Sequence, residues 1–176
     1  YMESAIASPV TITAISKAAP GVFSASGHTF VVGDSVLLEI QGMVELNGLL
    51  ATIVSVVAST SFQIAGVDGV TGLDTMLFST FSSGTAKKVT LGTTITGVQD
   101  FSFTGGEIKT TDTTTVNDLV DTQIVVGATA QSADMVMQWD PASTAQAAMI
   151  NAFKTRANKG FKLLYPDGAN VKWYGT

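Results

Sequence analysis

The residues that could carry chemistry in this sequence are few and scattered. There is one histidine, His28, and no cysteine. A catalytic triad or a zinc centre needs several such groups together, so His28, set between glycines and a β-like run, is typical of a turn residue with a local hydrogen bond. Hydroxyls are abundant, but without a general base they are weak nucleophiles. We therefore expect no catalytic, cofactor-binding or metal-binding residue and no enzyme, unless folding brings two distant carboxylates together.

Three aspartates, Asp112, Asp118 and Asp121, follow a glycine pair, Gly105-Gly106. The aspartates could hold Ca²⁺, but they lack the tight alternate spacing and the closing glutamate of a loop site, so a solvated loop is the simpler interpretation. The glycine pair precedes neither a Lys-Ser/Thr pair nor a helix start, so it predicts a hairpin turn and not a phosphate-binding loop.

Two tryptophans and a lysine pair are the remaining side chains that could bind a ligand. Trp139 and Trp173 could stack on sugars, but Trp139 closes a strand before a helix and Trp173 lies on a terminal strand, which favours burial in a core or an interface. Lys87 and Lys88 could contact DNA, yet adjacent residues on a strand point to opposite faces, so at most one would face any one surface.

The composition is apolar and poor in charge. Of 176 residues, 45% are hydrophobic and 13% charged, against about 25% charged in ordinary soluble domains. Because a monomer seldom exposes large contiguous apolar patches, we expect self-assembly to cover this surface. A net charge of −5 and a pI near 4.6 argue against binding nucleic acid through its phosphates.

Neither a membrane span nor a secretory signal is expected. The longest apolar stretch, Leu49–Ala58, is interrupted by Thr52 and Ser55 and is shorter than the ~20 residues that a spanning helix needs. The segment Tyr1–Ala7 has no basic start and no apolar run. Without cysteine, stability must come from packing alone.

Short alternating or β-branched runs, separated by Gly, Ser, Asp and Thr, predict a mainly β protein. The clearest runs are Val10–Ile15, Ser35–Ile40, Ala51–Val57 and Ser61–Ile64.

One segment, residues 141–158, predicts a helix. Met149, Ile150, Phe153 and Ala157 form one apolar stripe, which we expect to pack on a sheet. Asp140 and Pro141 are suited to the first turn, and the helix should end before Gly160. A hairpin follows, with strands at 161–165 and 170–174 around a Pro166-Asp167-Gly168 turn.

Between Gly105 and Gln123 the chain is rich in Thr, Asp and Gly, and it reads as one long loop. It could be an extended arm that grips a neighbour or a mobile, solvated excursion. The sequence alone does not decide between these two.

From Leu91 to Thr176 the order of features is two strands, the long loop, a strand, one amphipathic helix and the hairpin. The most distinctive residues in this order are Met137-Gln138-Trp139-Asp140-Pro141 before the helix and Phe161-Lys162-Leu163-Leu164-Tyr165-Pro166-Asp167-Gly168 after it. This order resembles the major tail tube proteins of phages with long non-contractile tails (siphovirus type). Family members usually continue with further strands past the hairpin, so this sequence is either truncated or a short member.

The resemblance implies a tail-tube-type β-sandwich flanked by one helix (about 141–158), with six copies per ring and stacked rings. Residues 94–103 and 133–139 would form the inner sheet, and the stripe Met149, Ile150 and Phe153 would cover it. The family's long loop bridges subunits, and we carry that role to Thr110, Thr111, Asp112, Thr113, Thr114, Thr115, Val116, Asn117, Asp118, Leu119, Val120, Asp121, Thr122 and Gln123.

Residues 12–89 resemble a different unit, a small β-barrel module inserted in phage tail proteins and similar to the first catalytic-cysteine half-domain of ubiquitin-activating enzymes. The resemblance rests on turn-forming runs, namely Ala18-Ala19-Pro20-Gly21, Gly27-His28, Gly33-Asp34, Glu45-Leu46-Asn47-Gly48 and Ser82-Ser83-Gly84-Thr85. It implies a tube domain of residues 1–11 and 90–176, with an interaction module of residues 12–89 on its outside.

The resulting hypothesis is a structural virion protein whose stacked rings form the tail tube through which DNA is delivered. Its partners would be copies of itself together with tape-measure, tail-terminator and baseplate or tip proteins. DNA would pass the lumen without specific binding, no membrane would be involved, and assembly would take place in the host cytoplasm. The alternative is a β-rich, adhesin-like module that binds carbohydrate or a receptor.

Overall fold

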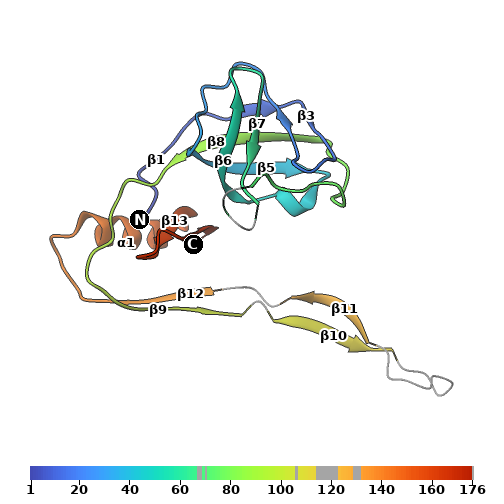
Figure 1. The fold of residues 1–176 in the computed structure, drawn as a ribbon. Helices are drawn as coiled ribbons and strands as arrows, with labels where there is room; N and C mark the ends of the chain where they lie inside the picture. The colour runs from blue at the N-terminus through green and yellow to red at the C-terminus, as the bar shows by residue number, and fades with distance from the viewer. Residues whose placement is uncertain (67–68, 70, 106, 114–122, 129–131, 176) are drawn as a thin grey trace. The chain divides into compact units, whose positions relative to one another are not determined.

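A computed structural model describes residues 1–66, 69, 71–113 without 106, 123–128 by backbone only, and 132–175. By contacts, the chain divides into two compact units, residues 1–95 with 144–176 and residues 96–143. The boundaries predicted near residues 12 and 89 lie inside the first unit. The mainly β fold with one α-helix is confirmed (Figure 1).

Eight strands of the first unit form one antiparallel sheet in the order β1-β8-β5-β6-β7-β4-β3, with β2 also paired to β8. Their bounds are β1 Ala5–Ile6, β2 Val10–Ile12, β3 Ala14–Ile15, β4 Phe23–Ser24, β5 Ser35–Gln41, β6 Leu50–Val57, β7 Ser61–Ile64 and β8 Ser83–Thr90, with a 3₁₀ turn η1 at Val44–Leu46. The four clearest runs of the sequence therefore all form strands.

The prediction of a β-barrel for residues 12–89 is not met, because the ladders of the described residues form an open path and not a closed ring. The chain bends at Thr13. On one side of it β2 pairs with β8, and on the other β3 pairs with β4. Residues 10–15 therefore form two short strands that pair with different partners, instead of one continuous strand.

The main core lies within this sheet. Phe23 and Phe62 stack with ring centroids 5.2 Å apart, and Phe30 meets Phe62 edge-on at 5.3 Å. All three are almost fully buried, and every buried residue of this cluster falls between Ile12 and Ala86. The buried residues of this main cluster therefore all come from the segment 12–89, with Val10 packed against them, whereas a smaller cluster of Leu37, Leu50 and Val89 is covered by Leu91 and Tyr174.

The C-terminal elements of the first unit are α1 (Thr144–Thr155), β13 (Lys159–Leu164) and β14 (Asn170–Gly175). The predicted hairpin is confirmed: β13 and β14 pair in register, and Gly168 occupies the turn at φ +90°. Glu3, only 6% exposed, joins this hairpin to the N-terminal segment by accepting from Gly160 N at 3.1 Å and from Lys159 Nζ at 3.1 Å.

The helix is shorter than predicted at both ends. Asp140 Oδ1 accepts from Ala142 N at 3.0 Å, so Asp140 forms a turn before the helix instead of capping it. At the other end, Arg156 adopts φ +53°, with Arg156 N bonded to Phe153 O and Ala157 N to Ala152 O. This pair of bonds is a Schellman ending, which stops the helix four residues before Gly160.

The helix buries Ala145, Gln146 and Ala152. Of the predicted stripe, Met149 is half-buried within the single chain, whereas Ile150 is 38% exposed and Phe153 is 83% exposed. Packing of the whole stripe against a sheet stays a prediction.

The second unit contains β9 (Val98–Thr104), β10 (Ile108–Asp112), β11 (Gln123–Ala128) and β12 (Ser132–Met137). β9 pairs with β12 and β10 pairs with β11, both antiparallel (Figure 1). The long loop predicted from Gly105 is therefore shorter, because five of its residues form β10. Threonine favours extended backbone, which accounts for this strand in a segment with few apolar residues.

Candidate assembly surfaces

The β9–β12 hairpin has two chemically different faces. Phe101 opposes Met135 and Phe103 opposes Ala133 in the ladder, so these four residues share the apolar face. Phe101 and Phe103 meet edge-on at 4.9 Å, and Phe103 remains 43% exposed.

Hydroxyls and carboxylates dominate the opposite face of the same hairpin. Ser102 lies across from Asp134, and Thr104 from Ser132. The Thr104 and Ser132 hydroxyl oxygens are 2.7 Å apart, and the Thr104 hydroxyl donates to Asp134 Oδ2 at 3.3 Å. Asp100 shares this side, opposite Val136. The hairpin can therefore bury one face while it keeps an acidic, hydrated face toward water.

Both ladders of the second unit are two-stranded. Within the described residues, each of β9, β10, β11 and β12 has one ladder partner. An isolated two-stranded hairpin is marginal in water, and a strand with one partner presents a row of backbone donors and acceptors to a further strand. Pairing of an edge strand with a strand of another chain would add to the stability of the hairpin and would also occupy the row of backbone donors and acceptors at its edge.

The residues predicted to contact other subunits fall partly in this unit's second hairpin. Thr110, Thr111 and Asp112 lie on β10 and are exposed, as is Thr113, while Gln123 begins β11. The remaining nine lie outside the described residues: Thr114, Thr115, Val116, Asn117, Asp118, Leu119, Val120, Asp121 and Thr122.

Large apolar side chains lie exposed at many points, as the low charge content indicated. Those more than half exposed are Val31, Val32, Val44, Val57, Met76, Leu77, Ile108, Val136, Trp139 and Phe153. Trp139 is 65% exposed, so of its two predicted kinds of burial the core of the single chain is excluded and an interface stays a prediction. Trp173 is half-buried and stacks on Phe161 at 5.5 Å.

His28 is a core residue. It is 2% exposed, its Nε2 lies 3.2 Å from Ser61 O, and its Nδ1 accepts from Phe30 N at 3.3 Å. An accepting Nδ1 leaves Nε2 to donate to the Ser61 carbonyl, so both ring nitrogens have partners within the chain. It also stacks on the Phe30 ring at 5.2 Å. The local hydrogen bond is as predicted, but its burial shows a packing role beyond that of a turn.

Lys87 and Lys88 point to opposite sides of β8, as their adjacency predicted. Lys87 pairs with Glu39, and Lys88 pairs with Asp34 at 2.7 Å. Both lysines are thereby engaged within the chain.

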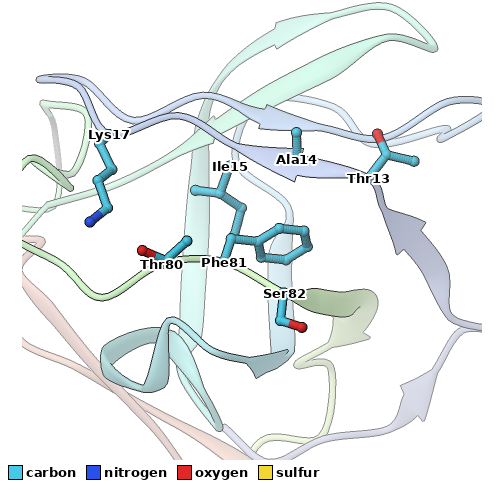
Figure 2. A pocket seen from close by; sticks show the side chains of 7 residues that line it. All are labelled: Thr13, Ala14, Ile15, Lys17, Thr80, Phe81 and Ser82. Carbon is cyan, nitrogen blue, oxygen red and sulfur yellow. The ribbon is translucent and has the colours of Figure 1, made fainter.

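Residues of the segments 13–17 and 80–82 line a cleft of about 570 Å³, and Figure 2 shows its lining side chains. Its lining is Thr13, Ala14, Ile15, Lys17, Thr80, Phe81 and Ser82. Lys17 is the one ionisable side chain among them, so the lining contains no acid–base pair. Among the described residues there is also no cluster of three His, Cys, Asp or Glu side chains that could hold a metal, and no helix there has the length and apolarity to cross a membrane.

Comparison with known families places the chain in one of them. Residues 41–176 match the family model described as "Phage tail tube protein, TTP". The match covers more than half of the chain, and the chain belongs to this family of structural virion proteins, which form the phage tail tube. The predicted resemblance to tail tube proteins is confirmed. No curated protein matches the chain.

The match gives no support to a likeness with ubiquitin-activating enzymes. It begins at residue 41, inside the segment 12–89 for which that likeness was predicted.

Proposed function

We propose that this tail tube protein assembles into closed, stacked rings, the hexamers that the resemblance implies, in which β9 and β12 pair edge to edge with the same strands of neighbouring copies.

 The observation that carries this proposal is the two-faced, two-stranded β9–β12 hairpin, whose strands each have one ladder partner within the described residues. A ring closes such edges, because the last copy pairs with the first.

The two faces of the hairpin suit a tube wall. Phe101, Phe103 and Met135 would lie on the buried side of the wall, and Asp100, Ser102 and Asp134 would line the channel. A wall of hydroxyls and carboxylates repels the phosphates of DNA, so a duplex could slide through without being held. Delivery of DNA then needs electrostatics and geometry but no catalysis, and we assign no enzyme activity.

We further propose that the segment 12–89 is a module with its own core, carried on the outside of the tube. The support is that the buried residues of the main cluster all come from this segment. The β10–β11 hairpin and the residues that follow Thr113 would bridge to neighbouring copies. Tape-measure, tail-terminator and baseplate or tip proteins would be the other partners, with assembly in the host cytoplasm.

Electron microscopy of the purified chain over rising concentration tests the assembly. We expect rings and tubes for the unmodified chain and for Ser132→Asp, which adds charge to the polar face opposite the uncharged Thr104. Phe103→Asp places the same charge on the neighbouring apolar face and should abolish tubes while circular dichroism still reports a folded chain. Tubes from Phe103→Asp would show that this face is not buried in the wall. Single particles at every concentration, with binding on a glycan array, would favour the adhesin-like alternative.

A further inference from the structure

The acidic character of the chain is confined to the second unit. Residues 96–143 contain seven acidic residues and one basic residue, a formal charge of −6, whereas the rest of the chain has seven acidic and eight basic residues, a formal charge of +1. Within that remainder, residues 144–176 contain five basic residues and one acidic residue. Two oppositely charged regions on one polypeptide can attract each other between copies.

Two of these basic residues, Lys162 on β13 and Lys172 on β14, form what we call the lysine pair. They are directly opposite in the ladder, and both are half-buried. Like charges directly opposite on neighbouring strands destabilise a hairpin. A pair of this kind therefore lowers the stability of the folded single chain unless a group of opposite charge lies close to it.

The ammonium groups of the lysine pair have uncharged neighbours within the described part of the chain, and the one charged group bound there to the backbone of the pair is the N-terminal ammonium of Tyr1, which donates to Lys162 O at 2.8 Å. Lys172 Nζ donates to Ser35 Oγ at 2.7 Å and to Thr52 Oγ1 at 2.6 Å. Lys162 Nζ lies 5.7 Å from the centre of the Tyr1 ring. Among the described residues the ion pairs of this unit involve Lys87, Lys88 and Lys159, and no carboxylate lies within ion-pairing distance of either member of the lysine pair.

There is also room beside Lys172 for an incoming side chain. A cavity of about 510 Å³ is lined by Lys172 together with Leu49, Leu50, Ala51, Thr52, Ala65, Gly66, Gly69, Gly168, Ala169 and Asn170. Among the described residues of this lining, Lys172 is the one ionisable group. A carboxylate entering here would meet the Lys172 ammonium group.

We propose that the lysine pair is the receiving surface for carboxylates of the acidic 96–143 unit of a second copy. The inference rests on the proposed self-assembly and adds which two surfaces meet. Contact between oppositely charged surfaces steers association and fixes which surfaces meet, and it weakens as salt is raised.

Zero-length carbodiimide cross-linking of assembled wild-type protein tests the contact directly, because it joins an amine to a carboxylate that already touches it. The sample is an equal mixture of isotopically light and heavy copies, so peptides joined between copies are recognised by mass spectrometry. We expect mixed-isotope links from Lys162 or Lys172 to acidic residues of 96–143. Assembled tubes whose links avoid the lysine pair would overturn this inference and leave the proposed function standing, whereas a failure to assemble would defeat both.

Charge reversal provides the matched test. Lys162→Glu with Lys172→Glu should raise the protein concentration needed for assembly roughly tenfold or more. Lys17→Glu with Lys154→Glu changes the net charge equally at exposed sites and should leave that concentration within about threefold. Equal effects of the two double variants would contradict a specific contact. Circular dichroism of the dilute chains identifies any variant that fails to fold, and in that case the wild-type cross-links decide.

Discussion

At the scale of single residues, the buried carboxylate of Glu3 connects the N-terminal segment to β13 through a hydrogen bond and an ion pair. Replacing it by alanine leaves the Gly160 N–H without its acceptor and Lys159 without its counter-ion. We expect Glu3→Ala to lower the free energy of unfolding by about 1–3 kcal/mol, measured by urea denaturation of the dilute chain. Glu39→Ala removes the partner of Lys87 at a more exposed site and should cost under about 1 kcal/mol. Equal losses would show that burial of Glu3 is unimportant.

Lys172 gives the chain a pH dependence whose sign can be worked out. Burial, with the charge of Lys162 as the smaller cause, lowers the pKa of the Lys172 ammonium from 10.5 to about 8. The unfolded chain therefore binds more protons than the folded one between these two values, and the free energy of unfolding rises with pH across that window. Below pH 8 the penalty of burying the charge is fully present.

Comparison with Lys172→Met isolates this effect. Relative to the variant, the wild-type chain should gain stability as the pH is raised from about 8 to about 10 in urea denaturation series. The window stops at about pH 10 because burial also raises the pKa of the Tyr174 phenol above its ordinary value of 10.0. Above that ordinary value the unfolded chain loses the phenol proton more readily than the folded chain, so the free energy of unfolding falls. A constant difference between the two chains over this range would contradict the assignment.

At the scale of elements, the end of α1 holds backbone strain at an identifiable position. Arg156 adopts φ +53°, a left-handed conformation that costs about 1–2 kcal/mol for most residues with a Cβ. Arg156→Gly should therefore raise the free energy of unfolding by about 1 kcal/mol, read from chemical denaturation. Arg156→Ala removes the same charge but keeps the Cβ, so a similar gain from alanine would mean that strain is not the cause.

Two phenylalanines of opposite burial test where the stability of the first unit comes from. Phe62, 1% exposed, packs against the rings of Phe23, Phe30 and His28, and Phe62→Ala should cost about 3–5 kcal/mol. Phe153→Ala, at a side chain 83% exposed, should change the free energy of unfolding of the dilute chain by less than about 0.5 kcal/mol. A large loss at Phe153 would show that the apolar stripe of the helix packs within the chain after all.

The same elements show what the sequence could predict. Periodicity found β5, β6 and β7 almost to the residue, because each run has both β-branched residues and turn signals at its ends. It also found the β13–β14 hairpin from its Pro-Asp-Gly turn. The helix was recognised, but its end depends on a non-glycine residue in the left-handed conformation, which is not a sequence signal for a stop.

The candidate site was less predictable, for physical reasons. An apolar stripe on α1 predicts burial but not against what, and in the single chain Ala145 and Ala152 are buried in place of Phe153. β10 was missed because a threonine-rich strand without a buried face has no apolar alternation. The lysine pair is created by ladder register, which brings together residues ten positions apart in sequence, Lys162 and Lys172.

At the scale of the whole molecule, membership of the tail tube family accounts for a surface that would be a liability in a monomer. Exposed apolar side chains such as Leu77, Trp139 and Phe153, with strand edges in two-stranded ladders, favour association. The excess negative charge lies in the unit that would form the channel and the bridges, and the remaining chain is close to neutral. We therefore expect the exposed apolar side chains and strand edges to be covered by other copies in the tube.

The most direct test is a cryo-electron microscopy reconstruction of the assembly formed by the concentrated, purified chain. We expect a hollow tube whose wall contains β9 and β12 hydrogen-bonded to the same hairpin of neighbouring copies, with Asp100 and Asp134 toward the channel. A chain that stays monomeric from dilute to concentrated solution, or a tube lined by other elements, would contradict the central claim.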